Sequence, residues 1–109
     1  MKLILGDKII EIEECQSFWR RFVGFMFRFR EIEKGLRFSH CSSIHTCFMF
    51  QPIDVIMTSK EGKVIKLYPN LGSERFILPK RGVYYTYELP VGSISNLKVG
   101  DFIQVKEKE

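Results

Sequence analysis

Alanine is absent from this sequence of 109 residues, and cysteine occurs only three times. The apolar bulk comes instead from β-branched and aromatic side chains, with twelve isoleucines, ten phenylalanines and seven valines. Alanine favours helices, whereas β-branched and aromatic residues suit the pleated, half-buried surface of a sheet. The composition therefore predicts a domain built mainly of β-strands.

The sequence also lacks an even number of cysteines and any long apolar run. An odd number of cysteines does not fit a secreted scaffold held together by disulfides. No basic start precedes a long apolar stretch, so the sequence predicts neither a signal peptide nor a membrane span. No repeat or linker divides the chain. We therefore expect a single domain over residues 1–109 and a cytoplasmic location.

Apolar runs separated by turn residues predict the strands, and Gly6-Asp7 and the sequence SKEG predict hairpin turns. The expected strands are residues 2–5, 8–12, 36–38, 44–50, 53–58, 63–68, 83–89 and 102–106. The prolines and glycines of YPNLGSERFILPKRG predict a loop between two of them, in which residues 75–78 could add one short strand. Apolar residues at helical spacing after Ser17 predict a helix that ends between Gly24 and Phe27, and residues 90–101 predict a turn or one helical turn. The expected fold class is α+β, a mainly antiparallel β-sheet curled towards a barrel, with about seven to eight strands and one or two short helices.

The stretch HCSSIHTCFMFQPIDV, residues 40–55, contains both histidines and two of the three cysteines. These side chains are His40, Cys41, His45 and Cys47. Zinc usually takes its four ligands from two short-spaced pairs in separate segments, and these all come from one. Along a strand, neighbouring side chains also point to opposite faces. We therefore expect no metal site and no cofactor, with Cys47 packing as an apolar residue.

Asp54 is the most informative polar residue, because it lies between Ile53 and Val55 in an apolar run. A carboxylate flanked by core residues must reach solvent or find donors, since burying it unpaired is costly. The candidate partners from the sequence are Arg21, Arg28, His45 and Thr46. Either such a network fixes the turn, or the groups converge on a small ligand. Glu88 in the sequence YELP presents the same alternatives.

A non-enzymatic binding domain is the function we expect from these residues. Its ligand would be small and polar or anionic, or its partner a protein. Arginine would neutralise an acidic group of the ligand, while His45 and Asp54 would orient that group by hydrogen bonds. The residues expected to line this concave face are Arg21, His45, Met49, Asp54 and Glu88. The oligomeric state is left open.

An enzyme is the second class of function. Cys41 lies four residues before His45, and Asp54 could orient that imidazole, as hydrolysis or acyl transfer would need. No Gly-x-Ser-x-Gly elbow, phosphate loop or dinucleotide fingerprint accompanies them. A third class is a weakly basic nucleic-acid-binding module, because arginines alternate with aromatic residues. Its residues would be Arg20, Arg28, Arg30 and Arg37. The formal charge of +4 is modest for such a domain, so we do not expect nucleic acid as the main partner.

Four segments in order resemble the prokaryotic family called domain of unknown function 192. RFVGFMFR (residues 21–28) is similar to that family's Arg-x-x-Gly-Leu-Met-Phe-Arg pattern, with Phe25 at the leucine position. CSSIHTCFMFQPIDV, VIMTSKEGKVIKLY and YELPVGSISNLKVGD are similar to later family segments. The sequence LPKRG departs from the family, because it lacks the tryptophan of a Pro-Trp-Arg-like element. The resemblance covers residues 15–105 and implies a compact, strand-rich α+β fold with no established activity.

Overall fold

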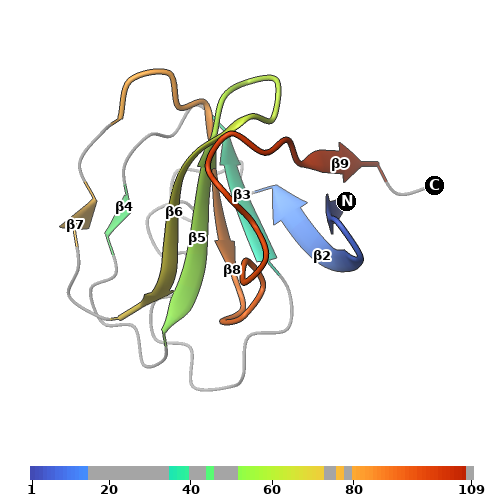
Figure 1. Cartoon of the computed structure of the whole chain (residues 1–109), viewed down its shortest axis with the longest axis horizontal. Helices are drawn as coiled ribbons and strands as arrows, with labels where there is room; N and C mark the ends of the chain where they lie inside the picture. Colours follow the sequence, from blue (N-terminus) through green and yellow to red (C-terminus); the bar gives the residue numbers. More distant parts are fainter. Residues whose placement is uncertain (15–34, 40–43, 46–51, 73–75, 78–79, 108–109) are drawn as a thin grey trace.

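A computed structural model describes residues 1–14, 35–39, 44–45, 52–72, 76–77 and 80–107, with only the backbone described at 44–45 and 76–77. Its largest feature is one seven-stranded sheet, shown in Figure 1. The strands of this sheet are β1 (Lys2–Leu5), β2 (Lys8–Glu14), β3 (Gly35–Ser39), β5 (Ile53–Thr58), β6 (Val64–Leu71), β8 (Tyr85–Leu89) and β9 (Gln104–Lys106). Two short strands, β4 (Ile44–His45) and β7 (Phe76–Ile77), pair separately.

The strand order in the sheet is β6-β5-β8-β3-β2-β1-β9. All neighbours in this order run antiparallel except β2 and β3, which are parallel. β5 lies between β6 and β8, and all six of its residues are buried. That burial explains why its sequence, IDVIMT, is an almost unbroken apolar run rather than an alternating one.

The sheet curls into a half-barrel whose two edges meet at one end. There the segment before β9 hydrogen-bonds to the start of β6: Val64 N–H donates to Asp101 O at 2.8 Å, and Ile103 N–H donates to Gly62 O at 3.0 Å. Gly62 has a φ of 94°, and a Cβ built there would lie 2.6 Å from Ile103 O. Only glycine fits this close approach without strain.

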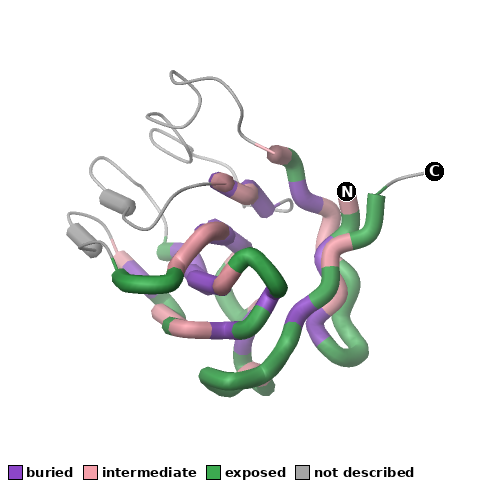
Figure 2. The backbone as a smooth tube through the Cα atoms, turned by 90° about the horizontal axis from the view of Figure 1, so that it is seen from above, coloured by how far each residue is buried: buried purple, intermediate pink, exposed green. Residues whose placement is uncertain are grey.

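Each face of the sheet carries its own apolar cluster. The inner face, inside the curl, carries Leu3, Leu5, Ile12, Ile56, Val64, Tyr87, Leu89, Ile94 and Ile103. The outer face carries Leu36, Phe38, Ile53, Val55, Met57 and Leu71. Alternate residues of β5 divide between the two clusters, as the period of a strand requires. Figure 2 shows the turns as exposed green stretches between buried segments.

The predicted sheet, mostly antiparallel and curled, is confirmed. The hairpin expected around SKEG is the β5–β6 pair, and residues 90–101 form turns. The parallel pairing of β2 with β3 was not predicted. The described residues contain no helix, and the helix predicted after Ser17 falls in residues 15–34, outside them. Most of the strand expected over residues 44–50 also lies outside them, with β4 covering its first two positions.

Candidate functional site

Asp54 lies at the start of β5, only 2% exposed. Its Oδ1 accepts the backbone N–H of Asn70 at 2.9 Å. Its Oδ2 accepts those of Gly92 at 2.9 Å and Ile94 at 3.1 Å. Hydrogen bonds from N–H groups to a carboxylate are among the stronger kinds in proteins, so three of them offset much of the cost of burial. Asp54 therefore links β6 and the turn after β8 to the start of β5.

The turn held by Asp54 plugs one end of the half-barrel. Ile94 is 4% exposed and belongs to the inner cluster, and Leu97 packs against that cluster. Lys8, at the start of β2, reinforces the attachment by donating from Nζ to Gly92 O at 2.7 Å. The turn thus closes the inner core at the end opposite the β5–β6 hairpin.

The partners of Asp54 differ from those expected. The sequence suggested side chains among Arg21, Arg28, His45 and Thr46, whereas the three hydrogen bonds come from backbone N–H groups. Of the two alternatives drawn from the sequence, this geometry matches the polar network that fixes a turn. A ligand-binding role for Asp54 is not tested by it.

Glu88, on β8, is buried without such a network. It is 5% exposed, and no hydrogen bond or ion pair reaches its carboxyl within the described part of the chain. Register places Glu88 directly opposite Leu36 on β3 and Val55 on β5, so its nearest cross-strand neighbours are apolar. Burial raises the pKa of Glu88 from 4.5 to about 8. At pH 7 the carboxyl is therefore mostly protonated, and it can donate a hydrogen bond as well as accept one.

Asp54 and Glu88 do not share a face. Asp54 pairs with Leu89, and Val55 pairs with Glu88. Because side chains alternate along a strand, Glu88 lies on the outer face with Val55, whereas Asp54 points to the inner side with Leu89. The structure therefore does not bring these two predicted site residues together on one concave face.

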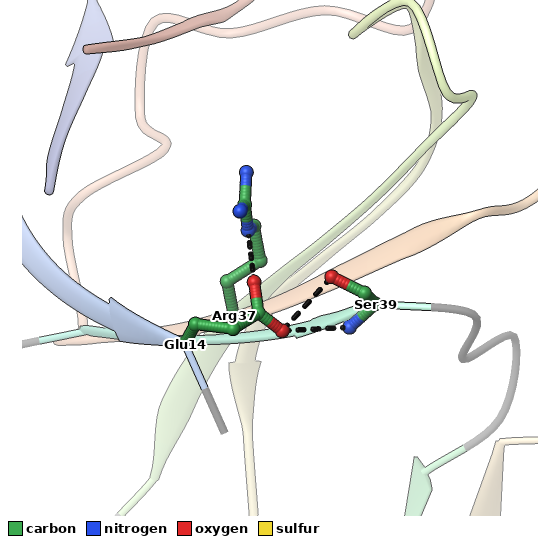
Figure 3. Close-up of polar contacts among 3 residues, drawn as sticks. All are labelled: Glu14, Arg37 and Ser39. Atoms are coloured by element: carbon green, nitrogen blue, oxygen red, sulfur yellow. Dashed lines mark hydrogen bonds and ion pairs between the residues drawn. The ribbon is translucent and has the colours of Figure 1, made fainter. Parts of the chain in front are cut away.

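A second polar group lies on the inner face, where β2 runs beside β3 (Figure 3). Arg37 Nε donates to Glu14 Oε1 at 2.6 Å. Glu14 Oε2 accepts the backbone N–H of Ser39 at 3.2 Å and its hydroxyl at 2.9 Å. The side chains of Arg37 and Glu14 are 15% and 16% exposed. This ion pair is shielded from solvent and ties the parallel strand pair together.

Two tyrosines of β8 complete this group. The Arg37 guanidinium lies 4.5 Å from the centre of the Tyr85 ring, close enough for a cation–π contact. Burial lowers the pKa of Arg37, but the hydrogen bond and negative charge of Glu14 outweigh burial, so the net shift is upward. Burial raises the pKa of Tyr87, while its hydrogen bond to Arg37 lowers it in part. Arg37 is thus held charged among two rings and a carboxylate.

Glu14 and Ser39 were missed as polar partners from the sequence, and Arg37 was considered only for a basic surface. A partial signal exists, because Glu14 follows an alternating run and Arg37 lies between two apolar residues of a strand. Both patterns place a charge among core residues. Nothing local indicates that the two strands are parallel neighbours, and that pairing creates the contact.

The structure does not describe the side chains of the remaining predicted site residues. Arg21, Met49 and Cys41 lie outside the described residues, and His45 is placed only by its backbone, paired with Phe76. Among the residues that are described, no group of three or more acidic, histidine or cysteine side chains could hold a metal ion. The described part of the chain also offers no helix capable of spanning a bilayer.

Sequence comparison relates residues 2–105 to the family model DUF192, described as an uncharacterized ACR. The UPF0127 protein of Thermococcus sibiricus is 34% identical over 106 residues, covering 90% of this chain and 68% of that protein. UPF0127 protein PF1050 of Pyrococcus furiosus is 35% identical over 105 residues, covering 87% of this chain and 86% of that protein.

Two crystal structures share the fold. A protein of unknown function from Novosphingobium aromaticivorans superposes with a TM-score of 0.77 at 19% identity, covering 95% of this chain and 82% of the other. A Sinorhizobium meliloti protein described as a "putative transcription regulator" gives a TM-score of 0.76 at 18% identity, covering 94% and 89%. At these identities the likeness extends to the fold alone.

Proposed function

The chain belongs to the DUF192 family, and from that premise we propose that it is a non-enzymatic domain that binds a small polar or anionic ligand beside Glu88. The observation that supports this proposal is the carboxyl of Glu88, which is 5% exposed and has no hydrogen-bond partner in the described part of the chain. No completely buried side-chain oxygen among the described residues lacks a partner, so this carboxyl keeps a small surface that a ligand can reach. A largely buried carboxyl without a protein partner is costly, because most of its hydration is lost and not repaid. Ionisable groups with strongly shifted pKa values cluster at functional sites, which favours a ligand here.

The chemistry of Glu88 fits an anionic or carbonyl-bearing ligand. A protonated carboxyl donates one hydrogen bond and accepts another, so it can pair with a carboxylate, a phosphate or an amide. Leu36 and Val55 flank Glu88 on the neighbouring strands and exclude water from its sides. Arg21, His45 and Met49 remain the further residues proposed to contact the ligand, with the arginine neutralising its charge. Asp54 faces the opposite side of the sheet from Glu88, so a ligand at Glu88 would not contact it.

Thermal-shift measurements test this site. The probes are dicarboxylates, monophosphates and neutral polyols, applied to the wild-type chain and to Glu88→Gln and Glu88→Leu. A ligand of the folded state raises the melting temperature. We expect an anionic probe to do so for the wild-type chain and more weakly for Glu88→Gln, which keeps a donor and an acceptor. Glu88→Leu, of similar bulk, should show no shift.

The pH provides an internal control. Above pH 8 the Glu88 carboxyl loses its proton and would repel an anion, so the shift should fade there. If Glu88→Leu responds to every probe as the wild-type chain does, the ligand does not bind at Glu88. If no probe class shifts the wild-type chain, a small ligand of these types is excluded, and a protein partner becomes the remaining form of the proposal.

The enzyme alternative rests on Cys41, His45 and Asp54. Asp54 already accepts three backbone N–H groups, which leaves little capacity to orient an imidazole. Alkylation of Cys41 by iodoacetamide between pH 6 and 9 would test this alternative. A rate that is already high at pH 6 would reveal the lowered thiol pKa that a nucleophile needs.

Nucleic-acid binding is the third alternative, and the words "putative transcription regulator" apply to the Sinorhizobium meliloti protein alone. Arg37, one of the four arginines considered for a basic patch, is paired with Glu14 on the inner face. The other three lie outside the described residues. Fluorescence anisotropy with a labelled duplex at 50 and 200 mM salt would test this role, because phosphate contacts weaken steeply with salt. A cytoplasmic location and a single domain also remain predictions from the sequence.

A further inference from the structure

A groove of about 430 Å³ lies between the β1–β2 turn and the segment from β8 to β9, and Glu88 does not line it. The turn between β1 and β2 forms one wall, and the turn after β8 with the segment before β9 forms the other. Its volume falls within the range of small-ligand sites in proteins. The two walls come from opposite ends of the sequence, so the groove exists only in the folded chain.

The groove carries negative charge that the chain itself does not neutralise. Asp7 and Asp101 both line it. Asp101 accepts the backbone N–H of Lys98 through Oδ2 at 2.9 Å, which leaves Oδ1 without a bond. In the described part of the chain, neither carboxylate forms an ion pair. This acidic groove lies on a chain whose formal charge is +4.

Lys8 also lines the groove, but its ammonium bonds to the turn after β8. Its Nζ donates to Gly92 O at 2.7 Å and to Ser95 Oγ at 3.3 Å. These contacts hold the ammonium against the turn after β8 instead of against a carboxylate. Two carboxylates and one ammonium leave the lining with a net charge of −1 at pH 7.

An aromatic ring and apolar carbon complete the lining. Phe102 is 68% exposed, an unusual exposure for so large an apolar side chain, and Leu97 also lines the groove. The face of an aromatic ring attracts a cation, and it also packs against methylene groups. Two carboxylates and an open ring that line the same groove are therefore complementary to an ammonium group carried on an alkyl chain.

We propose that this groove binds an organic cation, an alkylammonium whose charge lies between Asp7 and Asp101 and whose carbon chain packs on Phe102. The amine donates hydrogen bonds to the free carboxylate oxygens, and the ring stabilises the charge from one side. Asn96, also in the lining, offers an amide oxygen as a further acceptor. This site is independent of the ligand proposed at Glu88, since the two lie on different parts of the molecule and favour opposite charges.

Three probes of equal chain length separate charge from shape. They are 1,5-diaminopentane, 1,5-pentanediol and glutarate, titrated against the full chain at pH 7 and 20 mM salt while backbone amide shifts are followed by NMR. We expect the diamine to shift the amides of residues 5–8 and 93–102 saturably. The diol and the dicarboxylate should leave them unchanged. Binding of the diamine should weaken at 300 mM salt, because exposed charges are screened.

Single-charge variants locate the contact. Asp7→Asn should weaken diamine binding about three- to fivefold, as expected for one solvent-exposed charge contact. Asp101→Asn should do the same, and Phe102→Ala should weaken binding too. Glu61→Gln removes one negative charge from the β5–β6 turn outside the groove and should bind as the wild-type chain does.

Two results would overturn the proposal. One is diamine binding of equal strength in Asp7→Asn, Asp101→Asn and the wild-type chain, which would mean that general attraction, not the groove, holds the amine. The other is equal binding of the diol or glutarate. Asp7 makes no hydrogen bond in the described part of the chain, so its variant tests the site even if Asp101→Asn loosens the turn at Lys98.

Discussion

Asp54 and Glu88 are buried carboxyl groups on adjacent strands that occupy opposite faces of one sheet. Asp54 accepts three backbone N–H groups, whereas no hydrogen bond reaches Glu88 within the described part of the chain. The fold therefore supplies hydrogen-bond donors to Asp54, whereas burial of the Glu88 carboxyl lowers the free energy of unfolding when that carboxyl is charged. The two positions should respond to substitution in opposite directions.

Replacing Asp54 should destabilise the protein strongly. Asp54→Ala leaves the N–H groups of Asn70, Gly92 and Ile94 without their acceptor, at a cost of about 3 kcal/mol in the free energy of unfolding. Asp54→Asn keeps an acceptor oxygen but turns an amide N–H₂ towards donors, so we expect about 2 kcal/mol. Urea denaturation measures both. Glu61→Gln, at an exposed turn, is the control and should change stability by less than about 0.5 kcal/mol. A loss under about 1 kcal/mol for Asp54→Ala would contradict the anchoring role.

Glu88 should make stability fall as pH rises. The folded chain keeps the Glu88 proton up to about pH 8, whereas the unfolded chain releases it near pH 4.5. Between these values the folded state binds more protons, so the free energy of unfolding decreases with increasing pH. The penalty from Glu88 is absent well below pH 4.5, grows as the pH rises from 4.5 to 8, and reaches its full size above pH 8.

Glu88→Gln removes this titration and isolates its effect. The stability of Glu88→Gln minus that of the wild-type chain should increase between pH 5 and 9, by up to roughly 5 kcal/mol at about 1.4 kcal/mol for each unit of pKa difference. Denaturant midpoints measured at each pH give this difference. Parallel stability curves for the two proteins would show that Glu88 titrates normally.

Gly62 should tolerate no side chain. At a φ of 94°, with Ile103 O only 2.6 Å from a built Cβ, Gly62→Ala combines backbone strain with a clash against main chain, and we expect a loss of about 3 kcal/mol. Gly6 has a φ of 62° and no atom within 4 Å of its built Cβ, so Gly6→Ala isolates the backbone term at about 1 kcal/mol. Equal losses for both variants in thermal unfolding would mean that the edges do not meet as described.

The Arg37–Glu14 pair should show energetic coupling. In a double-mutant cycle with Arg37→Gln and Glu14→Gln, the coupling energy should be about 1 to 2 kcal/mol, more than for an exposed pair, because both side chains are largely buried. The coupling should persist at 0.5 M salt, since a shielded pair is weakly screened. Additivity of the two single substitutions within about 0.3 kcal/mol would show that the contact contributes nothing.

The sequence predicted the elements that depend on local patterns. The run from Ile53 to Thr58, a glycine-containing turn and a second run predicted the β5–β6 hairpin, because strand period and turn chemistry are both encoded within some fifteen residues. The curled, mostly antiparallel sheet followed from composition and short turns. The β2–β3 pairing did not follow, since a parallel pair is joined through a long connection that local pattern cannot place.

The candidate site depended on distant partners and was predicted only in part. The apolar neighbours of Asp54 and Glu88 in sequence marked both as residues that must reach solvent or find donors, and the structure buries both. The hydrogen-bond partners of Asp54 were not predicted, because the N–H groups that it accepts come from residues 16 to 40 positions away. The same holds for Arg37, whose partner Glu14 is 23 positions earlier. A sequence shows which side chains are charged. It does not show which backbone N–H groups the fold will place next to them.

On the side away from β2, β1 pairs with β9, which comes from the other end of the sequence, and the segment leading into β9 also reaches the start of β6. During synthesis, neither edge of the sheet can be completed until this segment has emerged from the ribosome. Most stabilising pairs join distant positions, so we expect slow folding, with sheet edges open to association in the nascent chain. Loss of the segment 100–106 should therefore yield aggregation rather than a smaller folded unit.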